Sequence, residues 1–181
     1  MNAKTDAPDG FEWREQRVAL FVDTQNLYYG ARDHHAGAVD YQRLLQAAAR
    51  GRRLAHATAY VVEREGDNTA YGFFTKLTSL GYRVKRRKVR VHRQTDDGRP
   101  LLEGDWDMGI AADIVRGLDN ADVIALASGD GDFAPMLELA QERGKRVEVL
   151  AFREVAGQAL QDLADRFLAL NDVPGIFLAN K

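Results

Sequence analysis

Two apolar runs of strand length end at an aspartate, and this feature limits the fold more than any other part of the chain. The run at 17–22, RVALFV, leads into Asp23, and the run at 121–127 leads into the polar segment 128–132, SGDGD. Continuous apolar runs are typical of parallel strands that are covered on both faces. Open α/β sheets bind ligands beyond the carboxyl ends of such strands. The two runs therefore predict a parallel sheet with a polar site at its carboxyl edge.

The rest of the chain alternates strand-like and helix-like segments. This alternation predicts an α/β fold, a Rossmann-like three-layer sandwich in which a mainly parallel central sheet carries helices on both faces. We expect strands at 17–22, 54–63, 82–91, 121–127 and 146–152, and helices from Thr24 onward and over 40–50, 67–80, 107–118, 133–143 and 155–170.

Length and composition limit the class of protein. The 181 residues suffice for one α/β domain, so we expect a flexible leader over 1–16, a single domain over 17–170 and a tail over 171–181. The chain has no cysteine, which excludes disulfides, thiolate zinc sites and a cysteine nucleophile. No apolar run approaches the ~18 residues of a membrane span, and the first residues lack the apolar core of a signal peptide. We expect a cytoplasmic protein without a membrane partner.

Carboxylates gather around the two strand ends. Asp105 and Asp107 precede a helix-like run, and Asp130 and Asp132 follow the strand at 121–127. Any one of them is explained as a helix cap, because aspartate accepts hydrogen bonds from the first backbone N–H groups of a helix. Capping does not explain a further carboxylate, Asp23, at the end of another strand.

The spatial prediction follows from the strand order. If the strands at 17–22 and 121–127 are neighbours, Asp23 and Asp130 leave the sheet at one edge, and Asp107 and Asp132 enter from helix starts. Two negative charges ~5 Å apart repel by roughly 3 kcal/mol at an effective dielectric of ~20, so the cluster needs a cation or bound protons. Oxygen ligands favour hard ions. We expect Asp23, Asp107, Asp130 and Asp132, together with Asp105, to bind Mg²⁺ or Mn²⁺ and to activate water for phosphodiester hydrolysis.

A basic segment precedes this acidic region. Residues 82–93 contain seven lysines and arginines and no acid. Two interpretations stay open: contacts with an RNA backbone through Arg86, Arg87, Lys88 and Arg90, or protection of an exposed edge strand against aggregation. The segment 95–100 that follows has the composition of a turn, either a hairpin tip or a mobile loop.

These motifs together resemble the NYN domain, including its LabA-like branch, in the PIN-like nuclease superfamily. The resemblance spans about residues 17–152 and is carried by FVDxxN at 21–26, GDWD at 104–107, SGDGDF at 128–133 and GKRV at 144–147. It implies a metal-dependent ribonuclease in which hydroxide attacks phosphorus and leaves a 5′-phosphate end. The family pattern often has Lys-Gly where this chain has Glu103-Gly104. By the resemblance, Asp23, Asp107, Asp130 and Asp132 match the metal-binding acids, and Asn26 and Ser128 match polar positions of the pocket, where they are expected to bind substrate.

Other functions fit the residues less well. A phosphatase that uses an aspartyl-phosphate intermediate usually has an acid two residues after its nucleophile, and here Gln25 stands at that position. A dinucleotide-binding loop at 129–134 would place Asp130 and Asp132 against a pyrophosphate.

The main alternative is an RNA-binding or partner-binding module of the same fold with weak or no cleavage. In that case the basic strand and Tyr28, Tyr29 and Tyr82 supply backbone contacts and base stacking, although tyrosines are more often packing residues. In either case we expect single-stranded RNA as the partner, and the sequence leaves a homodimer open. Trp106 is expected to anchor the start of its helix in the core.

Overall fold

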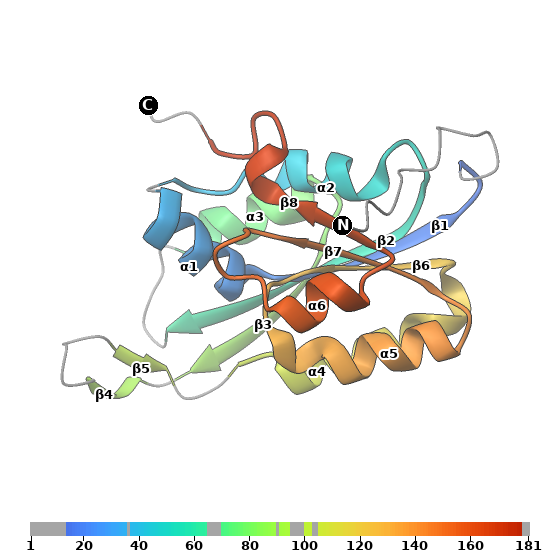
Figure 1. The fold of residues 1–181 in the computed structure, drawn as a ribbon. Helices are drawn as coiled ribbons and strands as arrows, with labels where there is room; N and C mark the ends of the chain where they lie inside the picture. The colour runs from blue at the N-terminus through green and yellow to red at the C-terminus, as the bar shows by residue number, and fades with distance from the viewer. Residues whose placement is uncertain are drawn as a thin grey trace.

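The apolar runs of the sequence form neighbouring strands of one parallel sheet (Figure 1). The computed structural model describes residues 14–35, 37–64, 70–89, 91–94, 100–102 and 105–178. Within these residues the sheet has six strands in the order β3-β2-β1-β6-β7-β8, and every neighbouring pair is parallel. Its strands are β1 (Arg17–Asp23), β2 (Arg53–Arg64), β3 (Arg83–Val89), β6 (Val123–Ala127), β7 (Arg146–Ala151) and β8 (Arg166–Ala169).

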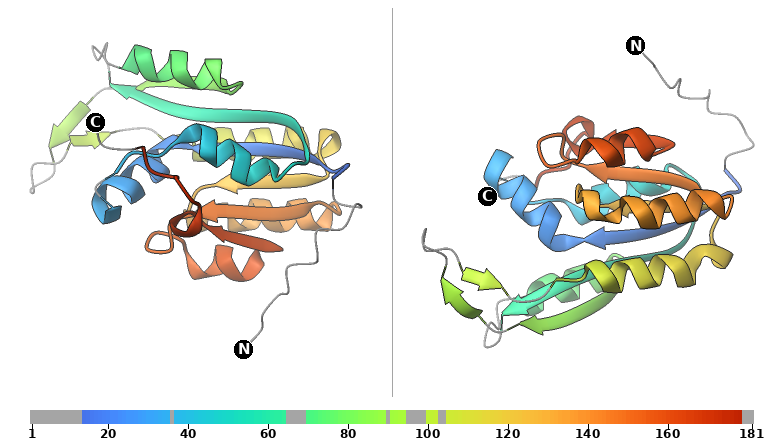
Figure 2. Two further views of the ribbon diagram at one scale, coloured as in Figure 1. Left: turned by 90° about the horizontal axis from the view of Figure 1, so that it is seen from above. Right: turned by 60° about the horizontal axis from the view of Figure 1, so that its bottom comes forward.

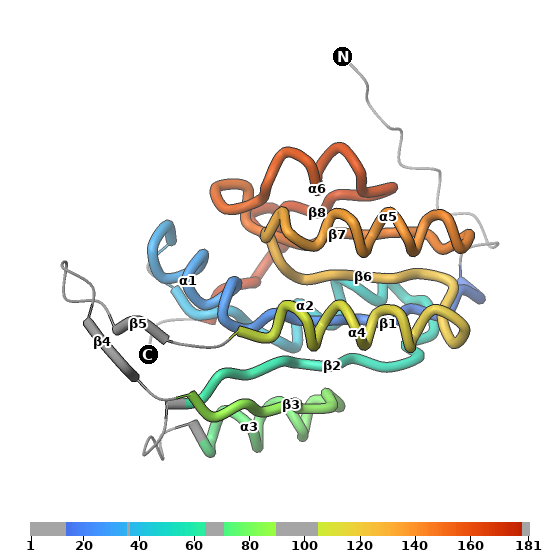
Figure 3. The backbone as a smooth tube through the Cα atoms, turned by 90° about the horizontal axis from the view of Figure 1, so that it is seen from below, coloured from blue at the N-terminus to red at the C-terminus, as the bar shows by residue number. Residues whose placement is uncertain are grey.

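Helices cover both faces of the sheet, as predicted. One face carries α1, α2 and α3, and the opposite face carries α4, α5 and α6 (Figures 2 and 3). The helices are α1 (Thr24–His35), α2 (Tyr41–Ala49), α3 (Ala70–Ser79), α4 (Asp107–Gly117), α5 (Ala134–Glu142) and α6 (Gln158–Leu163), with short 3₁₀ turns η2 (Leu118–Asn120), η3 (Gly131–Phe133) and η4 (Leu170–Asp172). The predicted Rossmann-like three-layer α/β architecture is therefore confirmed. No helix of the described residues is long and apolar enough to span a membrane.

The strand β1 shows why a continuous apolar run becomes a central strand. Val18, Leu20 and Val22 belong to the core under α1, α2 and α3, whereas Ala19 and Phe21 belong to the core under α4, α5 and α6. Alternate side chains of a strand point to opposite faces, so a strand between two helical layers needs apolar residues at every position. Burying a side chain the size of leucine or phenylalanine stabilises the fold by about 1.5–3 kcal/mol.

The register of β1 against β6 positions the site. Val18 pairs with Val123 and Val22 with Ala127, so Asp23 and Ser128 are the next residues along the two strands. Both residues therefore reach the same carboxyl edge of the sheet. The predicted adjacency of the two apolar strands is confirmed.

The C-terminal part corrects one prediction. The expected helix over 155–170 is wrong in its second half, because α6 ends at Leu163 and Arg166–Ala169 form the edge strand β8 beside β7. The carboxylate of Asp165 accepts a hydrogen bond from the backbone N–H of Val147 at 2.8 Å, which anchors the chain beside β7. Leu160 and Phe167, expected on one helix face, pack on the same core from a helix and from a strand. An apolar stripe alone did not distinguish these two cases.

The predicted strand at 82–91 is also divided. β3 ends at Val89, and a separate antiparallel pair follows, made of β4 (Val91–Gln94) and β5 (Pro100–Leu102). The pairing agrees with the hairpin interpretation of the turn. The tip itself, 95–99, and the first residues of the expected helix, 67–69, lie outside the described residues.

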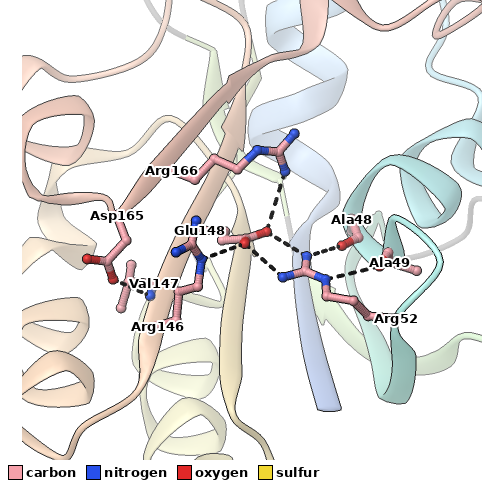
Figure 4. A network of polar contacts seen from close by, with 8 residues as sticks. All are labelled: Ala48, Ala49, Arg52, Arg146, Val147, Glu148, Asp165 and Arg166. Carbon is pink, nitrogen blue, oxygen red and sulfur yellow. Dashed lines mark hydrogen bonds and ion pairs between the residues drawn. The ribbon is translucent and has the colours of Figure 1, made fainter. Parts of the chain in front are cut away.

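A buried ion-pair network connects β7, β8 and the segment before β2 (Figure 4). The carboxylate of Glu148 is buried and accepts hydrogen bonds from Arg52 at 2.7 and 2.8 Å, from Arg146 at 3.0 Å and from Arg166 at 3.5 Å. Burial alone would raise the pKa of Glu148, but the arginines, Arg52 first, hold it below its ordinary value. The charge is therefore retained in the interior, where it joins three separate segments.

Candidate functional site

Asp23 combines two structural roles at the end of β1. One carboxylate oxygen, Oδ1, accepts the backbone N–H groups of Gln25 at 3.1 Å and Asn26 at 3.0 Å, so Asp23 caps α1. The other oxygen, Oδ2, accepts the hydroxyl of Ser128 at 3.3 Å. Burial, and to a smaller degree the charge of Asp130, raises the pKa of Asp23, although the backbone N–H groups oppose this shift. The side chain is thus fixed in place, and its surroundings disfavour the charged form of the carboxylate.

The loop after β6 is held by hydrogen bonds to both strand ends. The side-chain oxygen of Asn26 accepts the backbone N–H of Gly129 at 2.9 Å, and the hydroxyl of Ser128 accepts the backbone N–H of Asp130 at 3.2 Å. Asp130 then caps η3, because its Oδ1 accepts the N–H of Asp132 at 3.0 Å. The cap expected from sequence is present, and it leaves the second oxygen of Asp130 without a backbone partner among the described residues.

Trp106 fixes the start of α4, as predicted. Its indole N–H donates to the backbone carbonyl of Val61 at 3.0 Å, and its ring meets Tyr60 edge-on at 5.4 Å between centroids. A Cβ added at Gly109 would lie 2.5 Å from the indole, so the glycine makes room for the ring. With Trp106 fixed, Asp107 occupies the first turn of α4 at the carboxyl edge of the sheet.

Asp107 lies within electrostatic range of the other four predicted acids. Burial first, and then the charges of Asp105, Asp130, Asp23 and Asp132, raise the pKa of Asp107 to about 6. Within the part of the chain that the structure describes, no lysine or arginine forms an ion pair with Asp23, Asp107, Asp130 or Asp132. The cluster therefore carries negative charge that its described neighbours do not neutralise.

The donor chemistry of the cluster fits a hard divalent cation. All five side chains offer carboxylate oxygens. A bound cation would offset the repulsion between these negative charges. Among the described residues, however, no three histidine, cysteine, aspartate or glutamate side chains converge closely enough to hold a metal ion. The acids are gathered at one edge, and closer convergence requires side-chain movement.

The basic strand β3 lies at the edge of the sheet, and two of its basic side chains, Lys85 and Arg86, form ion pairs within the protein. Arg86 forms two hydrogen bonds with Glu63, at 2.6 and 2.7 Å, and its guanidinium lies 4.1 Å from the ring centre of Phe74. This arrangement agrees with the structural interpretation of Arg86. Lys88 is exposed, and Arg90 lies outside the described residues.

Arg87 is the member of the basic strand that reaches the acidic edge. Its guanidinium lies 4.7 Å from the ring centre of Trp106 and donates to the backbone carbonyl of Asp105. A cation thus stands beside the segment that carries Asp105 and Asp107. Of the described basic residues predicted to contact substrate, Arg87 is the best placed.

Sequence reasoning missed a polar group on α4. The hydroxyl of Tyr60 donates to Asp113 at 2.7 Å, and Lys85 and Arg116 form ion pairs with the same carboxylate. The pKa of Asp113 is lowered, since these partners outweigh burial, which alone would raise it. The i,i+3 spacing of Asp113 and Arg116 on the predicted helix was the available sequence signal, whereas the contacts with Tyr60 and Lys85 depend on the three-dimensional fold.

The segment after β7 was also missed as a support of the acidic loop. The N–H of Gly157 donates to the carbonyl of Gly129 at 3.0 Å, and a Cβ added at Gly129 would lie 2.6 Å from the carbonyl oxygen of Val155. The glycine inside the SGD motif was the available sequence signal, because a glycine often marks a close approach of two backbones.

A parallel α/β sandwich with an acidic cluster at the carboxyl edge defines the class as PIN-like, a group of folds whose members are generally nucleases. The chain belongs to the NYN domain family, whose sequence model matches residues 17–171. This result confirms the resemblance inferred from the motifs.

The chain is also similar to individual proteins. The protein is 28% identical over 163 residues to the low amplitude and bright protein LabA of Synechococcus elongatus, covering 89% of this chain and 87% of LabA. It is 35% identical over 74 residues to an uncharacterized protein of Methanocaldococcus jannaschii, covering 40% of this chain and 31% of that protein. A crystal structure of a protein of unknown function from Vibrio parahaemolyticus superposes with a TM-score of 0.78 at 31% identity, covering 91% of this chain and 98% of that chain.

Proposed function

We propose that the protein is a ribonuclease that hydrolyses phosphodiester bonds of single-stranded RNA with the help of Mg²⁺ or Mn²⁺. The observation that carries this proposal is the unneutralised carboxylate cluster at the carboxyl edge, where four neighbouring acids help to raise the pKa of Asp107 to about 6. A structural cluster would be expected to include its own cations, as the pairs around Asp113 and Glu148 do. Strongly perturbed acids in a family of nucleases favour a catalytic role.

The chain's own residues divide the work. Asp23, Asp107, Asp130 and Asp132, with Asp105 beside them, are the residues that would hold the cation. A bound divalent ion supplies a water of lowered pKa and shields the phosphoryl oxygens of the substrate. Ser128 and Asn26 keep Asp23 and the loop after β6 in position through the hydrogen bonds given above. Arg87 is placed to attract the RNA backbone toward the acidic edge.

One experiment tests the proposal directly. Purified protein is incubated with a labelled single-stranded RNA and Mn²⁺, and cleavage is compared for the parent, Asp130→Asn and Asp119→Asn, in which Asp119 is an exposed aspartate beyond the other end of α4. We expect cleavage by the parent and by Asp119→Asn, and a loss of at least about 100-fold in Asp130→Asn, since general base and metal contributions reach this size. Equal rates for all three proteins would refute the assignment.

The second candidate is an RNA-binding module that cleaves weakly or not at all. It is favoured by one observation, the lack of three converging metal-ligand side chains among the described residues. Parent protein that binds the RNA but leaves it intact at every Mn²⁺ concentration, and that shows no Mn²⁺ binding by calorimetry, would establish this function instead. Salt dependence of the RNA affinity then measures the phosphate contacts.

A further inference from the structure

A cavity of about 610 Å³ adjoins the acidic edge at the start of α1. Its lining residues come from α1, α2, α3 and β2 and from the segment before α2. The three helices cover the face of the sheet opposite to α4 (Figures 1 and 2). Thr24 and Gln25, the two residues that follow Asp23, form part of its wall. The backbone N–H of Gln25 also donates to Asp23. The first turn of α1 is therefore shared by the cavity and by the candidate site.

The cavity is lined by aromatic rings from three helices. Tyr28 and Tyr29 of α1 contact each other edge-on, with ring centroids 5.4 Å apart, and Tyr41 of α2 meets Phe73 of α3 in the same way at 5.3 Å. Tyr28 is 56% exposed, so its ring is accessible to a ligand. Aromatic faces of this kind stack with nucleobases, whose own rings are flat and apolar on both sides.

Basic side chains stand beside the rings of the cavity. The guanidinium of Arg32 lies 4.7 Å from the ring centre of Tyr29 and 5.5 Å from that of Tyr28, and it is paired with the carboxylate of Asp33 at 2.6 Å. Lys76 of α3 also lines the cavity and is exposed. Two carboxylates belong to the wall: that of Glu63 is paired with Arg86, and that of Asp40 caps α2 by accepting the backbone N–H groups of Gln42 and Arg43. Cations beside aromatic rings attract a phosphate while the rings hold the base.

The half-buried Gln25 adds a polar contact. Its side-chain amide offers both donors and an acceptor, which is the combination that reads the edge of a base.

Burial, and to a lesser degree the charge of Asp23, raises the pKa of the Tyr41 hydroxyl, which places that ring within electrostatic range of the acidic edge. A cavity of this volume, mostly apolar with a few polar groups, is of the size that binds small molecules.

We propose that this cavity binds a nucleobase of the RNA strand whose phosphate lies at the carboxylate cluster. The inference rests on the proposed function and extends it from cleavage to substrate recognition. One nucleotide of the strand enters between the rings of α1 and those of α2 and α3, while the backbone passes over the first turn of α1. The strand must be single in this region, because a paired base cannot leave its duplex without loss of stacking.

The test uses a set of 8-nucleotide RNAs that differ only in the position of one abasic ribose. Their affinities are measured by fluorescence anisotropy in EDTA, which prevents hydrolysis. We expect one position at which loss of the base weakens binding about 10-fold, the size of one base–aromatic stack, while the other positions have smaller effects. In Tyr28→Ala, intact RNA should bind as weakly as this abasic RNA binds to the parent, and the abasic substitution should then have no further effect.

Two variants control for indirect effects. Tyr28→Phe keeps the ring and should retain the position dependence. Tyr71→Ala removes a ring that is 73% exposed on α3 but does not line the cavity, and it should behave as the parent. Loss of the position dependence in Tyr71→Ala, or its survival in Tyr28→Ala, would overturn the proposal.

A second measurement separates failure of this inference from failure of the proposed function. Adenosine, guanosine, cytidine and uridine 5′-monophosphates are titrated into ¹⁵N-labelled protein, and we expect backbone amide shifts at residues of the cavity wall such as Thr24, Gln25 and Lys76. RNA that is bound or cut with no preferred abasic position and no such shifts refutes the base cavity alone. RNA that is neither bound nor cut refutes the nuclease and the RNA-binding module, and the nucleotide titration then decides the cavity by itself.

Discussion

The side-chain oxygen of Asn26 accepts a hydrogen bond from the backbone N–H of Gly129 at 2.9 Å, across 103 residues of sequence. This contact joins the first turn of α1 to the loop that carries Asp130. It explains why an asparagine three residues after Asp23 belongs to the motif, since the amide oxygen holds the acidic loop against the end of β1. The role expected for Asn26 from the resemblance was contact with substrate, and its observed partner is the protein itself.

Removal of this contact has a measurable cost. Asn26→Ala leaves the N–H of Gly129 without its acceptor, and we expect the free energy of unfolding to fall by about 1–2 kcal/mol. We also expect the rate of RNA cleavage to fall, because the acidic loop is no longer held against the end of β1. Urea denaturation and cleavage rates provide the two measurements. Asn120→Ala, at an exposed position after α4, serves as the control and should change neither quantity. A variant at 26 that unfolds and cleaves as the parent does would contradict this role.

Glycine at 129 is required by a close backbone approach. A Cβ at this position would lie 2.6 Å from the carbonyl oxygen of Val155, whereas a Cβ at Gly131 would meet nothing within 4 Å. We expect Gly129→Ala to lower the free energy of unfolding by about 1–3 kcal/mol and to displace the acidic loop, because backbone atoms cannot move aside as a flexible side chain can. Gly131→Ala is the matched control in the same loop. Similar melting temperatures for the two variants would contradict the prediction.

The raised pKa of Asp107 predicts an unusual dependence of stability on pH. Because the folded protein binds a proton at Asp107 up to a pKa of about 6, while an unfolded aspartate releases it near 3.8, stability contributed at this residue falls as the pH rises from about 4 to about 6. We therefore expect the free energy of unfolding of metal-free Asp107→Asn, measured relative to the parent, to be higher at pH 8 than at pH 4. The expected change is on the order of 1 kcal/mol after allowance for solvent screening.

This prediction is checked by urea denaturation at both pH values in EDTA. The control is Asp119→Asn, because Asp119 is exposed and lies beyond the other end of α4. Its free energy of unfolding should change between the two pH values as that of the parent does. Added Mn²⁺ should reverse the order at pH 8, since the ion would favour the parent carboxylate. A constant difference between Asp107→Asn and the parent from pH 4 to pH 8 would argue against repulsion within the cluster.

The Glu148 network gives a prediction of opposite sign. The folded pKa of Glu148 is lowered, so its contribution to stability is fully present above the unfolded pKa of 4.5 and is lost as the pH falls through the folded value. Glu148→Gln removes the carboxylate and leaves the guanidinium of Arg52 buried beside Arg146 and Arg166 (Figure 4). We expect a loss of about 3–5 kcal/mol at pH 7.

Thermal unfolding at pH 7 measures this loss, and Glu142→Gln, at an exposed position near the end of α5, is the control. Cleavage by the folded fraction of Glu148→Gln should be retained, because the network belongs to the amino-terminal part of β7 and not to the acidic edge. A stable variant at 148 would show that the three arginines find other partners at little cost.

The alternation of apolar runs was sufficient to predict the layers of the fold and the adjacency of β1 and β6. Strand burial on both faces and the carboxyl-edge rule depend on short-range properties, and the register of β1 against β6 brings Asp23 and the start of the loop that carries Asp130 to one edge, as predicted. The stripe at 155–170 failed because Leu160 and Phe167 can face one core from a helix or from a helix followed by a strand. Pairing with β7 decided between them, and pairing is a long-range property.

The same distinction applies to the candidate site. The acids were predicted as a group, but the internal partners of Arg86 and Lys85 were not, because Glu63 and Asp113 belong to distant elements. Charge counts along β3 therefore overstated the number of cations available to a substrate. Arg87 is the basic residue of β3 that reaches the acidic edge, because its guanidinium stacks on Trp106.

Each of Asp23 and Asp130 is held by backbone N–H groups that come from the turn immediately after it. These caps are formed by three or four consecutive residues, and the contacts of Ser128 with Asp23 and of Gly129 with Asn26 join the two strand ends. Lengthening a crossover far from this rim should leave the individual acids oriented as before. The orientation of each carboxylate is therefore set locally, whereas the distance between them is set by the pairing of β1 with β6 and by these two contacts.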